Sequence, residues 1–264
     1  MNARTEPAEK ESDSIARPPL LSEFLLVTGL FLVYKVGRQL AAGHTGEALH
    51  NARRVWDLER TLHLPDEATV QSALLHGDVL VHLANTYYAT VHFPATLGFL
   101  VWLYLRRPAH YRWARRVLAA VTAAALVLPF TFPLAPPRML TATGMEDTAR
   151  VYGPSVYGPP SSDHLSNQFA AMPSLHFAWA LMVAIGLIAA TRSRWRWLWL
   201  LHPAATLLVI VGTANHYWLD AIVATAMLGL ALALIHRPHH RAGPASRGTR
   251  RYTPKQHVLV GAGR

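Results

Sequence analysis

The chain of 264 residues contains no cysteine, which excludes disulfide bonds, thiol nucleophiles and thiolate metal ligands. Charged residues are also scarce, because Asp, Glu, Lys and Arg make up 15% of the chain against 52% hydrophobic residues. This balance is unusual for a water-soluble globule and favours an integral membrane protein. A soluble bundle of helices is the alternative.

Six apolar segments contain most of the hydrophobic residues. Five of them have about 17–19 residues, near the lower limit for a helix that spans a bilayer, and the second is longer. They lie at 20–36, 79–105, 117–134, 172–190, 197–214 and 218–235. Pro94 in the second segment predicts a tilt or a kink. We therefore expect an all-α, polytopic membrane protein in which six transmembrane helices form a bundle.

Acidic residues are missing from one set of connecting segments. Residues 106–116, 192–196 and 237–264 together contain 15 Lys and Arg and no Asp or Glu. The opposite loops, 37–78 and 135–171, contain 9 acidic and 6 basic residues. Because cytoplasmic loops are rich in Lys and Arg, both termini are expected in the cytoplasm. The net charge of +10 then faces the inner leaflet, and no nucleic-acid partner is expected.

The two ends of the chain show no hydrophobic periodicity. Residues 1–19 are predicted to be a disordered cytoplasmic N-terminus and 237–264 a basic cytoplasmic tail, so the membrane domain comprises 20–236. Residues 46–64 carry an apolar stripe among charges, which predicts a helix on the outer membrane surface. The stripe consists of Leu49, Val55, Trp56 and Leu62.

Polar residues gather at the ends of the predicted spans, on the side opposite the basic segments. PLAPPRML follows the third span, MPSLH begins the fourth, and TANHYWLD joins the fifth to the sixth. Taken separately, Arg138 fits an interfacial anchor, Ser174 a helix cap, and His216 with Asp220 a structural pair. Their common location on one membrane face indicates instead a shared site.

The residue types in these clusters suit phosphate chemistry. His216 and Asp220 are four residues apart at the start of an apolar helix, so the carboxylate can accept the imidazole N–H, fix its tautomer and raise its basicity. Ser174 follows a proline at a predicted helix start, where its hydroxyl and the next backbone N–H groups can bind an anion. Arg138 adds a planar cation suited to phosphate.

A histidine nucleophile, a second histidine at His176 to carry a proton, and donors for a phosphate make a minimal site for phosphoryl transfer. A metal site is the competing interpretation, because the chain has 15 histidines. The outer clusters lack a His-Glu-x-x-His or carboxylate-rich spacing. We therefore expect no metal and no cofactor.

The order PPR, PSLH and HYWLD on six membrane helices resembles the type 2 phosphatidic acid phosphatase superfamily. Within it, the chain is similar to the branch of fungal inositol phosphorylceramide synthase. The resemblance covers about residues 20–236 and implies a phosphatase/haloperoxidase-like core. It also implies an enzyme that generally works without a metal.

The resemblance further implies a role for each motif residue. His216 forms a phosphohistidine and Asp220 orients it. His176 protonates the leaving alkoxide and then activates the acceptor. Ser174 and Arg138 hold the phosphate oxygens.

Three positions depart from the broader family pattern. Thr131 and Ile210 stand where that pattern has a lysine and an arginine, and Leu175 where it has a glycine. Fewer cations around the phosphate indicate a singly charged phosphodiester substrate rather than a doubly charged monoester. Other cations on the outer side that can reach the phosphate are Arg53, Arg54 and Arg150.

The second span carries His82 and Asn85 near its outer end, on roughly one helix face with His92. His82 and Asn85 are possible substrate contacts. The alternative is a role in hydrogen bonding between helices.

The expected function is that of a metal-independent lipid phosphotransferase or phosphatase that acts through a phosphohistidine on a phospholipid headgroup. The partners are then a lipid phosphate substrate, an alcohol or water acceptor, and membrane lipids. One alternative is a polyprenyl-diphosphate or phosphatidic acid phosphatase; another is a non-catalytic lipid-binding or transport protein, although transporters place polar residues near the midplane. The arginine- and alanine-rich composition favours a bacterial plasma membrane, with the site on its extracytoplasmic face.

Overall fold

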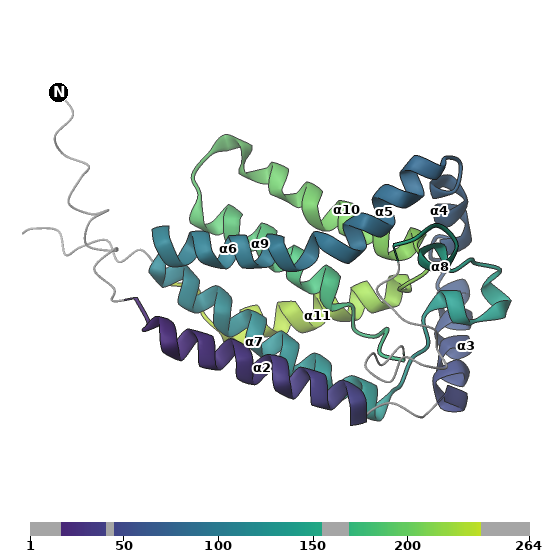
Figure 1. Ribbon diagram of the computed structural model, residues 1–264, viewed down its shortest axis with the longest axis horizontal. Helices are drawn as coiled ribbons and strands as arrows, with labels where there is room; N and C mark the ends of the chain where they lie inside the picture. Colours follow the sequence, from purple (N-terminus) through teal and green to yellow (C-terminus); the bar gives the residue numbers. More distant parts are fainter. Residues whose placement is uncertain (1–16, 41–44, 155–168, 239–264) are drawn as a thin grey trace, which may run out of the picture.

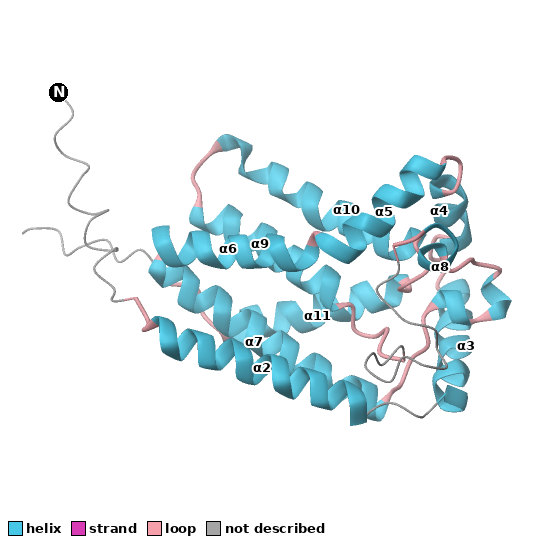
Figure 2. Ribbon diagram, in the orientation of Figure 1, coloured by secondary structure: helices cyan, strands magenta, loops and turns pink. Residues whose placement is uncertain are grey.

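The computed structural model describes residues 17–40, 45–154 and 169–238 (Figure 1). The described part consists of helices and loops and contains no strand (Figure 2). The α-helices are α2 (Leu20–Leu40), α3 (Thr45–Thr61), α4 (Glu67–Leu74), α5 (Asp78–Thr90), α6 (His92–Arg106), α7 (Pro108–Thr131), α8 (Thr148–Tyr152), α9 (Leu175–Ala190), α10 (Leu201–Gly212) and α11 (Trp218–Leu234). Three 3-10 helices are η1 (Pro137–Met139), η2 (Thr141–Thr143) and η3 (Arg194–Leu200). Most of the predicted disordered N-terminus 1–19 and of the predicted tail 237–264, namely residues 1–16 and 239–264, lies outside the described residues.

Each of the six apolar segments is largely helical, but their lengths differ from the prediction. Among the described residues, α7 and the continuous unit Arg194–Gly212 are each long and apolar enough to cross a membrane. The bent pair of α5 and α6 makes a third candidate, whereas the apolar helices Leu20–Gly29, α9 and α11 are shorter. By length and composition, the described residues thus contain two or three candidate spans rather than six.

The predicted kink in the second span is confirmed. α5 ends at Thr90 and α6 begins at His92, and their axes differ by 49°. Pro94 has no backbone N–H with which to bond the carbonyl of Thr90 four residues earlier. The helix therefore breaks one turn before the proline.

The prediction that residues 106–116 form a loop between two spans was wrong. α7 begins at Pro108, so only Arg107 separates it from α6. Proline suits the first position of a helix, since its fixed φ is helical and its missing N–H would have had no partner there. Three of the five arginines of this segment, Arg112, Arg115 and Arg116, therefore lie on the first turns of α7, where Trp113 and Ala114 are buried against the bundle.

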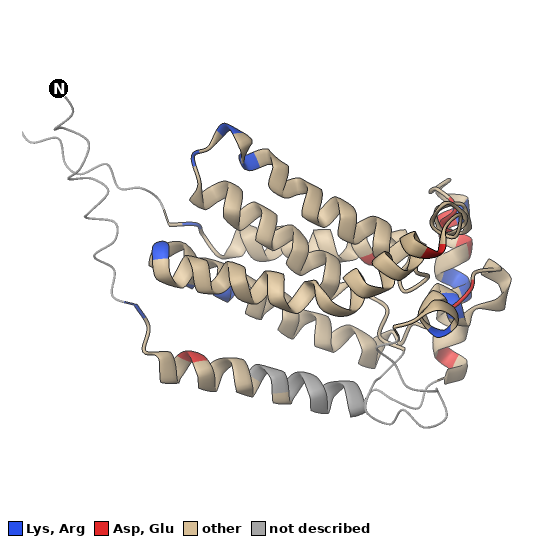
Figure 3. Ribbon diagram, turned by 45° about the horizontal axis from the view of Figure 1, so that its top comes forward, with Lys and Arg blue, Asp and Glu red and all other residues tan. Residues whose placement is uncertain are grey.

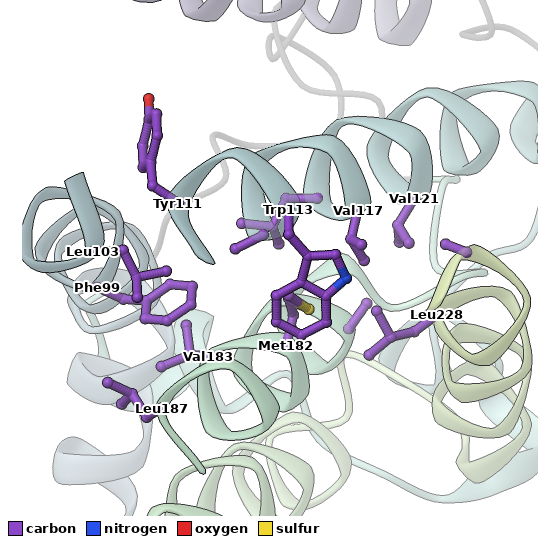
Figure 4. Close-up of a cluster of buried hydrophobic side chains, with 14 of the residues drawn as sticks. Phe99, Leu103, Tyr111, Trp113, Val117, Val121, Met182, Val183, Leu187 and Leu228 are labelled. Atoms are coloured by element: carbon purple, nitrogen blue, oxygen red, sulfur yellow. The ribbon is translucent and has the colours of Figure 1, made fainter. Parts of the chain in front are cut away.

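The hydrophobic core is built around α9, which contacts α6, α7, α10 and α11. Figure 4 shows Trp113 and Val117 of α7 facing Met182 of α9, with Leu228 of α11 beside them. Gly186 allows α6 to approach closely, because a Cβ atom there would overlap the Phe99 ring. The apolar residues all around α9 thus bury it at the centre of the bundle.

The two ends of the bundle differ in charge (Figure 3). Most of the described arginines lie at the end formed by the α6–α7 junction and η3, which we call the basic end, although α3 and the segment after α7 also carry arginines at the other end. The described acidic residues, apart from Glu23 of α2, lie at the opposite end, over α3, α4, the segment after α7 and the starts of α5 and α11. We call this second end the site end, because the predicted polar clusters lie there.

α3 lies across the site end of the bundle (Figure 1). The predicted helix over 46–64 is confirmed, but its buried face differs from the predicted stripe. Val55 is buried as expected, whereas Leu62 is 54% exposed. The buried face instead includes Asn51 and Glu59. α3 therefore caps the end of the bundle with a partly polar face.

Candidate functional site

Three segments distant in the chain meet at the site end through their main chains. The backbone N–H of Arg138, after α7, donates to the carbonyl of Ala214 at 3.1 Å. The backbone N–H of Ser174, before α9, donates to the carbonyl of Asp220 at 3.3 Å. The three polar motifs predicted to share a site are therefore neighbours in the structure.

His216 and Asp220 form a buried pair at the start of α11. The Nδ1 atom of His216 lies 3.1 Å from Oδ2 of Asp220, and the Tyr217 backbone N–H donates to the same oxygen at 3.0 Å. Asp220 is completely buried, and His216 is 6% exposed. If Nδ1 carries the proton that this contact requires, Nε2 keeps its lone pair and is able to act as a nucleophile.

A tight turn between α10 and α11 presents this histidine. Ala214 has a φ of +56°, in the left-handed region that residues with a Cβ adopt rarely. The turn lets the backbone N–H groups of Asn215 and His216 both donate to the carbonyl of Ile210, at 3.1 Å each. It thereby satisfies the carboxyl end of α10 and places His216 just before the next helix. Such local backbone strain is common at functional sites.

His176 lies in the first turn of α9 and faces His216. The two imidazole centroids are 6.3 Å apart. The His176 ring stacks on Tyr88 at 4.4 Å and lies 4.4 Å from His92, which in turn stacks on Trp179. These aromatic contacts from α5, α6 and α9 hold the second histidine beside the first. Sequence reasoning missed Tyr88, and for His92 the only signal was its place on one helix face with His82.

Ser174 is the N-cap of α9, as predicted. Its Oγ accepts the backbone N–H of Phe177 at 3.4 Å, and the residue is completely buried. The cap uses a lone pair of the oxygen and leaves the hydroxyl hydrogen free for donation to another acceptor. Ser174 thus lies where a hydroxyl donor and a helix N-terminus coincide.

Arg138 contacts two residues that sequence reasoning did not select, one of which is the neighbour of His216 in the chain. Its Nη1 donates to Oδ1 of Asn215 at 2.5 Å, and its Nε lies 3.5 Å from Oδ2 of Asp147. Asn215 is itself fixed by a bond from its Nδ2 to Thr213 Oγ1 at 2.8 Å. The position of Asn215 next to His216 could have marked it as a site residue. No sequence pattern around Asp147 predicts a contact with Arg138.

His82 and Asn85 contact α8 and the residue that follows it. Asn85 Nδ2 donates to the carbonyls of Thr148 and Gly153 at 2.9 Å each, and Thr148 Oγ1 donates to Asn85 Oδ1 at 2.8 Å. The exposed His82 ring meets the Tyr152 ring edge-on. These contacts favour a role in positioning α8, and the substrate contact of both residues stays a prediction.

The described residues of the site end do not form a metal centre. No group of three His, Asp or Glu side chains is arranged to hold a metal ion within 17–40, 45–154 and 169–238. The described groups beside His216 are a carboxylate, a second imidazole, a hydroxyl and a guanidinium. Together they can supply a nucleophile, a proton carrier and phosphate donors.

Comparison with known proteins gives one match. A family model described as "PAP2 superfamily" matches residues 53–234, which cover more than half of the chain and all of the site residues described above. Neither the search of curated proteins nor that of solved structures gave a match.

Proposed function

The chain belongs to the PAP2 superfamily, and from this membership together with the site geometry we propose that it is a lipid phosphotransferase or phosphatase that forms a phosphohistidine on His216. Membership supports a phosphatase-type enzyme. The observation that carries the finer proposal is the buried His216–Asp220 pair with the His176 ring 6.3 Å away. Two histidines in these positions suit a nucleophile and an acid–base partner.

The proposed reaction has two steps. Nε2 of His216 attacks phosphorus, the bond from phosphorus to the leaving oxygen breaks, and His176 gives that oxygen a proton. An acceptor alcohol or water then loses its proton to His176 and attacks phosphorus, which breaks the N–P bond and regenerates His216. Asp220 stabilises the imidazolium-like charge, while Ser174 and Arg138 donate to the phosphate oxygens.

The charge beside His216 favours a phosphodiester donor. Arg138 lies against the Asp147 carboxylate, which offsets part of its charge. A doubly charged monoester would need more cationic groups than a singly charged phosphodiester does. We therefore propose transfer of a phospholipid headgroup, as in the inositol phosphotransferase-like branch, ahead of a polyprenyl-diphosphate or phosphatidic acid phosphatase.

We further propose that the domain 20–236 crosses the plasma membrane of a bacterium six times. Large apolar side chains are exposed on the flanks of the bundle, among them Leu97, Leu208 and Leu230 at 64%, 57% and 62%. Such surface is typical of lipid contact. The basic end then lies in the cytoplasm and the site end outside.

Labelling with an impermeant thiol reagent tests this orientation, because the natural chain has no cysteine to interfere. Single cysteines replace Thr141 at the site end and Arg192 at the basic end, both exposed. In intact cells the first is expected to react and the second to react only after lysis. The reverse pattern would contradict the orientation.

A substrate panel tests the function. Purified protein is offered phosphatidic acid, phosphatidylinositol and a polyprenyl diphosphate, each with and without a lipid alcohol, and products are identified by mass spectrometry. Transfer from the phosphodiester is expected, and the activity should survive EDTA because the proposed steps use no metal. Activity confined to monoesters or diphosphates would establish the phosphatase alternative. No turnover of any lipid, with binding retained, would favour a non-catalytic protein.

A further inference from the structure

Glu59 of α3 is buried against the start of α11. It is completely buried, and its Oε1 accepts the backbone N–H of Leu219 at 2.7 Å. Leu219 precedes Asp220, so this bond caps the same helix turn that carries the partner of His216. Nearby, the Trp218 indole N–H donates to the carbonyl of Pro65 at 2.8 Å. The α3–α4 segment therefore holds α11 at two adjacent residues.

The second oxygen of Glu59 faces another buried carboxyl group. Glu67 of α4 is 2% exposed and lies within hydrogen-bonding reach of Glu59. Glu59 Oε2 and Glu67 Oε1 have no donor among the described residues. Two carboxylate oxygens cannot bond each other without a proton between them. If the two groups share one proton, the pair carries one negative charge. Arg60 can balance that charge, since its Nη2 lies 2.7 Å from Glu67 Oε2.

From this geometry we propose that Glu59 is a positioning residue of the active site: in its protonated form it bridges Glu67 and the backbone of Leu219 and so holds Asp220 against His216. The proposal rests on the function proposed above. It gives α3 a part in catalysis, although no residue of α3 contributes to the predicted polar clusters. Glu59 touches neither histidine and acts only through the first turn of α11.

The surroundings of Glu59 keep it neutral. Burial first, and then the hydrogen bond and negative charge of Glu67, raise its pKa to about 9. The charge of Asp220 acts in the same direction, and the bond from Leu219 opposes it. The other groups around the pair are Arg60, Asp66 and Tyr217; burial raises the pKa of the Tyr217 hydroxyl far above its usual range, so it stays neutral. Ionisation of Glu59 would add a second negative charge beside Glu67 and Asp220.

Binding of orthovanadate tests the proposal, because an analogue of the transition state of phosphoryl transfer reports the geometry of the site without a known substrate. Vanadium NMR on the full chain in detergent gives the dissociation constant. Glu59→Gln keeps both hydrogen bonds, since its amide oxygen accepts from Leu219 and its NH₂ donates to Glu67. Its affinity should stay within about threefold of the natural protein, whereas Glu59→Met, of similar size, should bind about tenfold more weakly.

Two controls separate the possible causes. Glu47→Met changes an exposed glutamate of the same helix and should have no effect. His216→Ala removes the nitrogen that is proposed to bond vanadium directly, so it should abolish binding of vanadate. If the natural protein fails to bind vanadate, or if His216→Ala binds normally, the proposed function fails and the positioning role with it. If His216→Ala loses binding while folded Glu59→Met binds normally, only the positioning role is wrong.

The pH dependence gives a readout that a purely structural role would not change. The measured quantity is the vanadate affinity of the natural protein divided by that of Glu59→Gln, because this ratio cancels the titration of vanadate itself. Because the raised pKa keeps Glu59 protonated below about 9, the ratio should be constant from pH 7 to that value and fall above it as the carboxyl ionises. A constant ratio up to about pH 10 would overturn the proposal, even if Glu59→Met did not fold.

Discussion

Two buried glutamates, at opposite ends of the bundle, have different surroundings. Glu23 of α2, near the basic end, accepts a hydrogen bond from the Tyr111 hydroxyl at 2.6 Å and an ion pair from Arg115. Both of its oxygens therefore meet a donor. Glu59, at the site end, meets one backbone N–H and another carboxyl group. The surroundings of Glu23 stabilise an ionised carboxylate, whereas those of Glu59 stabilise a protonated carboxyl group.

The two glutamates accordingly differ in role: one supports helix packing and the other supports the proposed active site. The Glu23 contacts fasten α2 to α7, and no residue of the proposed reaction lies near them. The Glu59 contacts hold the first turn of α11, next to His216. Buried charge that is fully compensated supports packing, while a shared proton makes the local structure depend on protonation.

The comparison predicts first that chemistry resides at the site end. His216→Ala should lower turnover about 10³-fold or more, because no other group can form the phosphoenzyme. Trapping of a labelled phosphoenzyme after a short incubation measures the covalent step. His50→Ala, an exposed histidine of α3, is the matched control and should label normally. Normal labelling of His216→Ala would rule out this nucleophile.

Removal of the proton carrier should have an effect that depends on the leaving group. With a lipid alcohol as leaving group, His176→Ala should lower turnover about 10²–10⁴-fold, since an alkoxide needs a general acid. With a nitrophenyl phosphodiester the loss should be below about tenfold, because the phenol leaves without protonation. The ratio of the two losses is the measurement. Equal losses on both substrates would assign His176 another role.

At the basic end the expected effect is on stability and not on chemistry. Glu23→Ala leaves the Tyr111 hydroxyl and the Arg115 guanidinium without their buried acceptor, so unfolding should become easier by about 2 kcal/mol. Thermal unfolding in detergent measures this change, and Glu23→Gln, which keeps one acceptor, should lose less. Turnover per folded molecule should stay unchanged. A variant that is stable but slow would show that the two ends are not independent.

The smallest expected effect concerns substrate charge. Asp147→Asn frees Arg138 from a half-exposed carboxylate, which should raise the kcat/KM for a phosphate monoester relative to a diester by about fivefold or less. The exposed Asp78→Asn at the start of α5 is the control for a general change of charge. An unchanged ratio would mean that Asp147 has no influence on the choice of substrate.

Much of the fold was predictable from the sequence, because apolar length and proline position act locally. The helical segments and the break before Pro94 follow from such signals. The short helices α4 and α8 do not, since 8 and 5 residues are too few for a periodic pattern. The prediction of a loop over 106–116 was wrong because it took a run of basic residues as a sign of a loop, although arginine is a good helix former.

The candidate site was predictable where its residues lie in motifs at helix starts. The i, i+4 spacing of His216 and Asp220 and the N-cap of Ser174 are local, and the structure shows both. Glu59 was not predictable in this way. A glutamate between Leu58 and Arg60 in a charged helix is typical of a solvated face. Only the tertiary contact with Leu219 shows that Glu59 is buried against α11.

The main-chain bonds between the motifs have a practical consequence. Because Arg138 is tied to Ala214, and Ser174 to Asp220, through peptide groups, the frame of the site does not depend on which catalytic side chains it carries. A variant without His216 should therefore keep the phosphate donors Arg138 and Ser174 in place, and it should retain its lipid because the nitrogen proposed to attack phosphorus is gone. Purified from its native membrane, the His216→Ala protein would serve as bait, and the lipid extracted with it would identify the natural substrate.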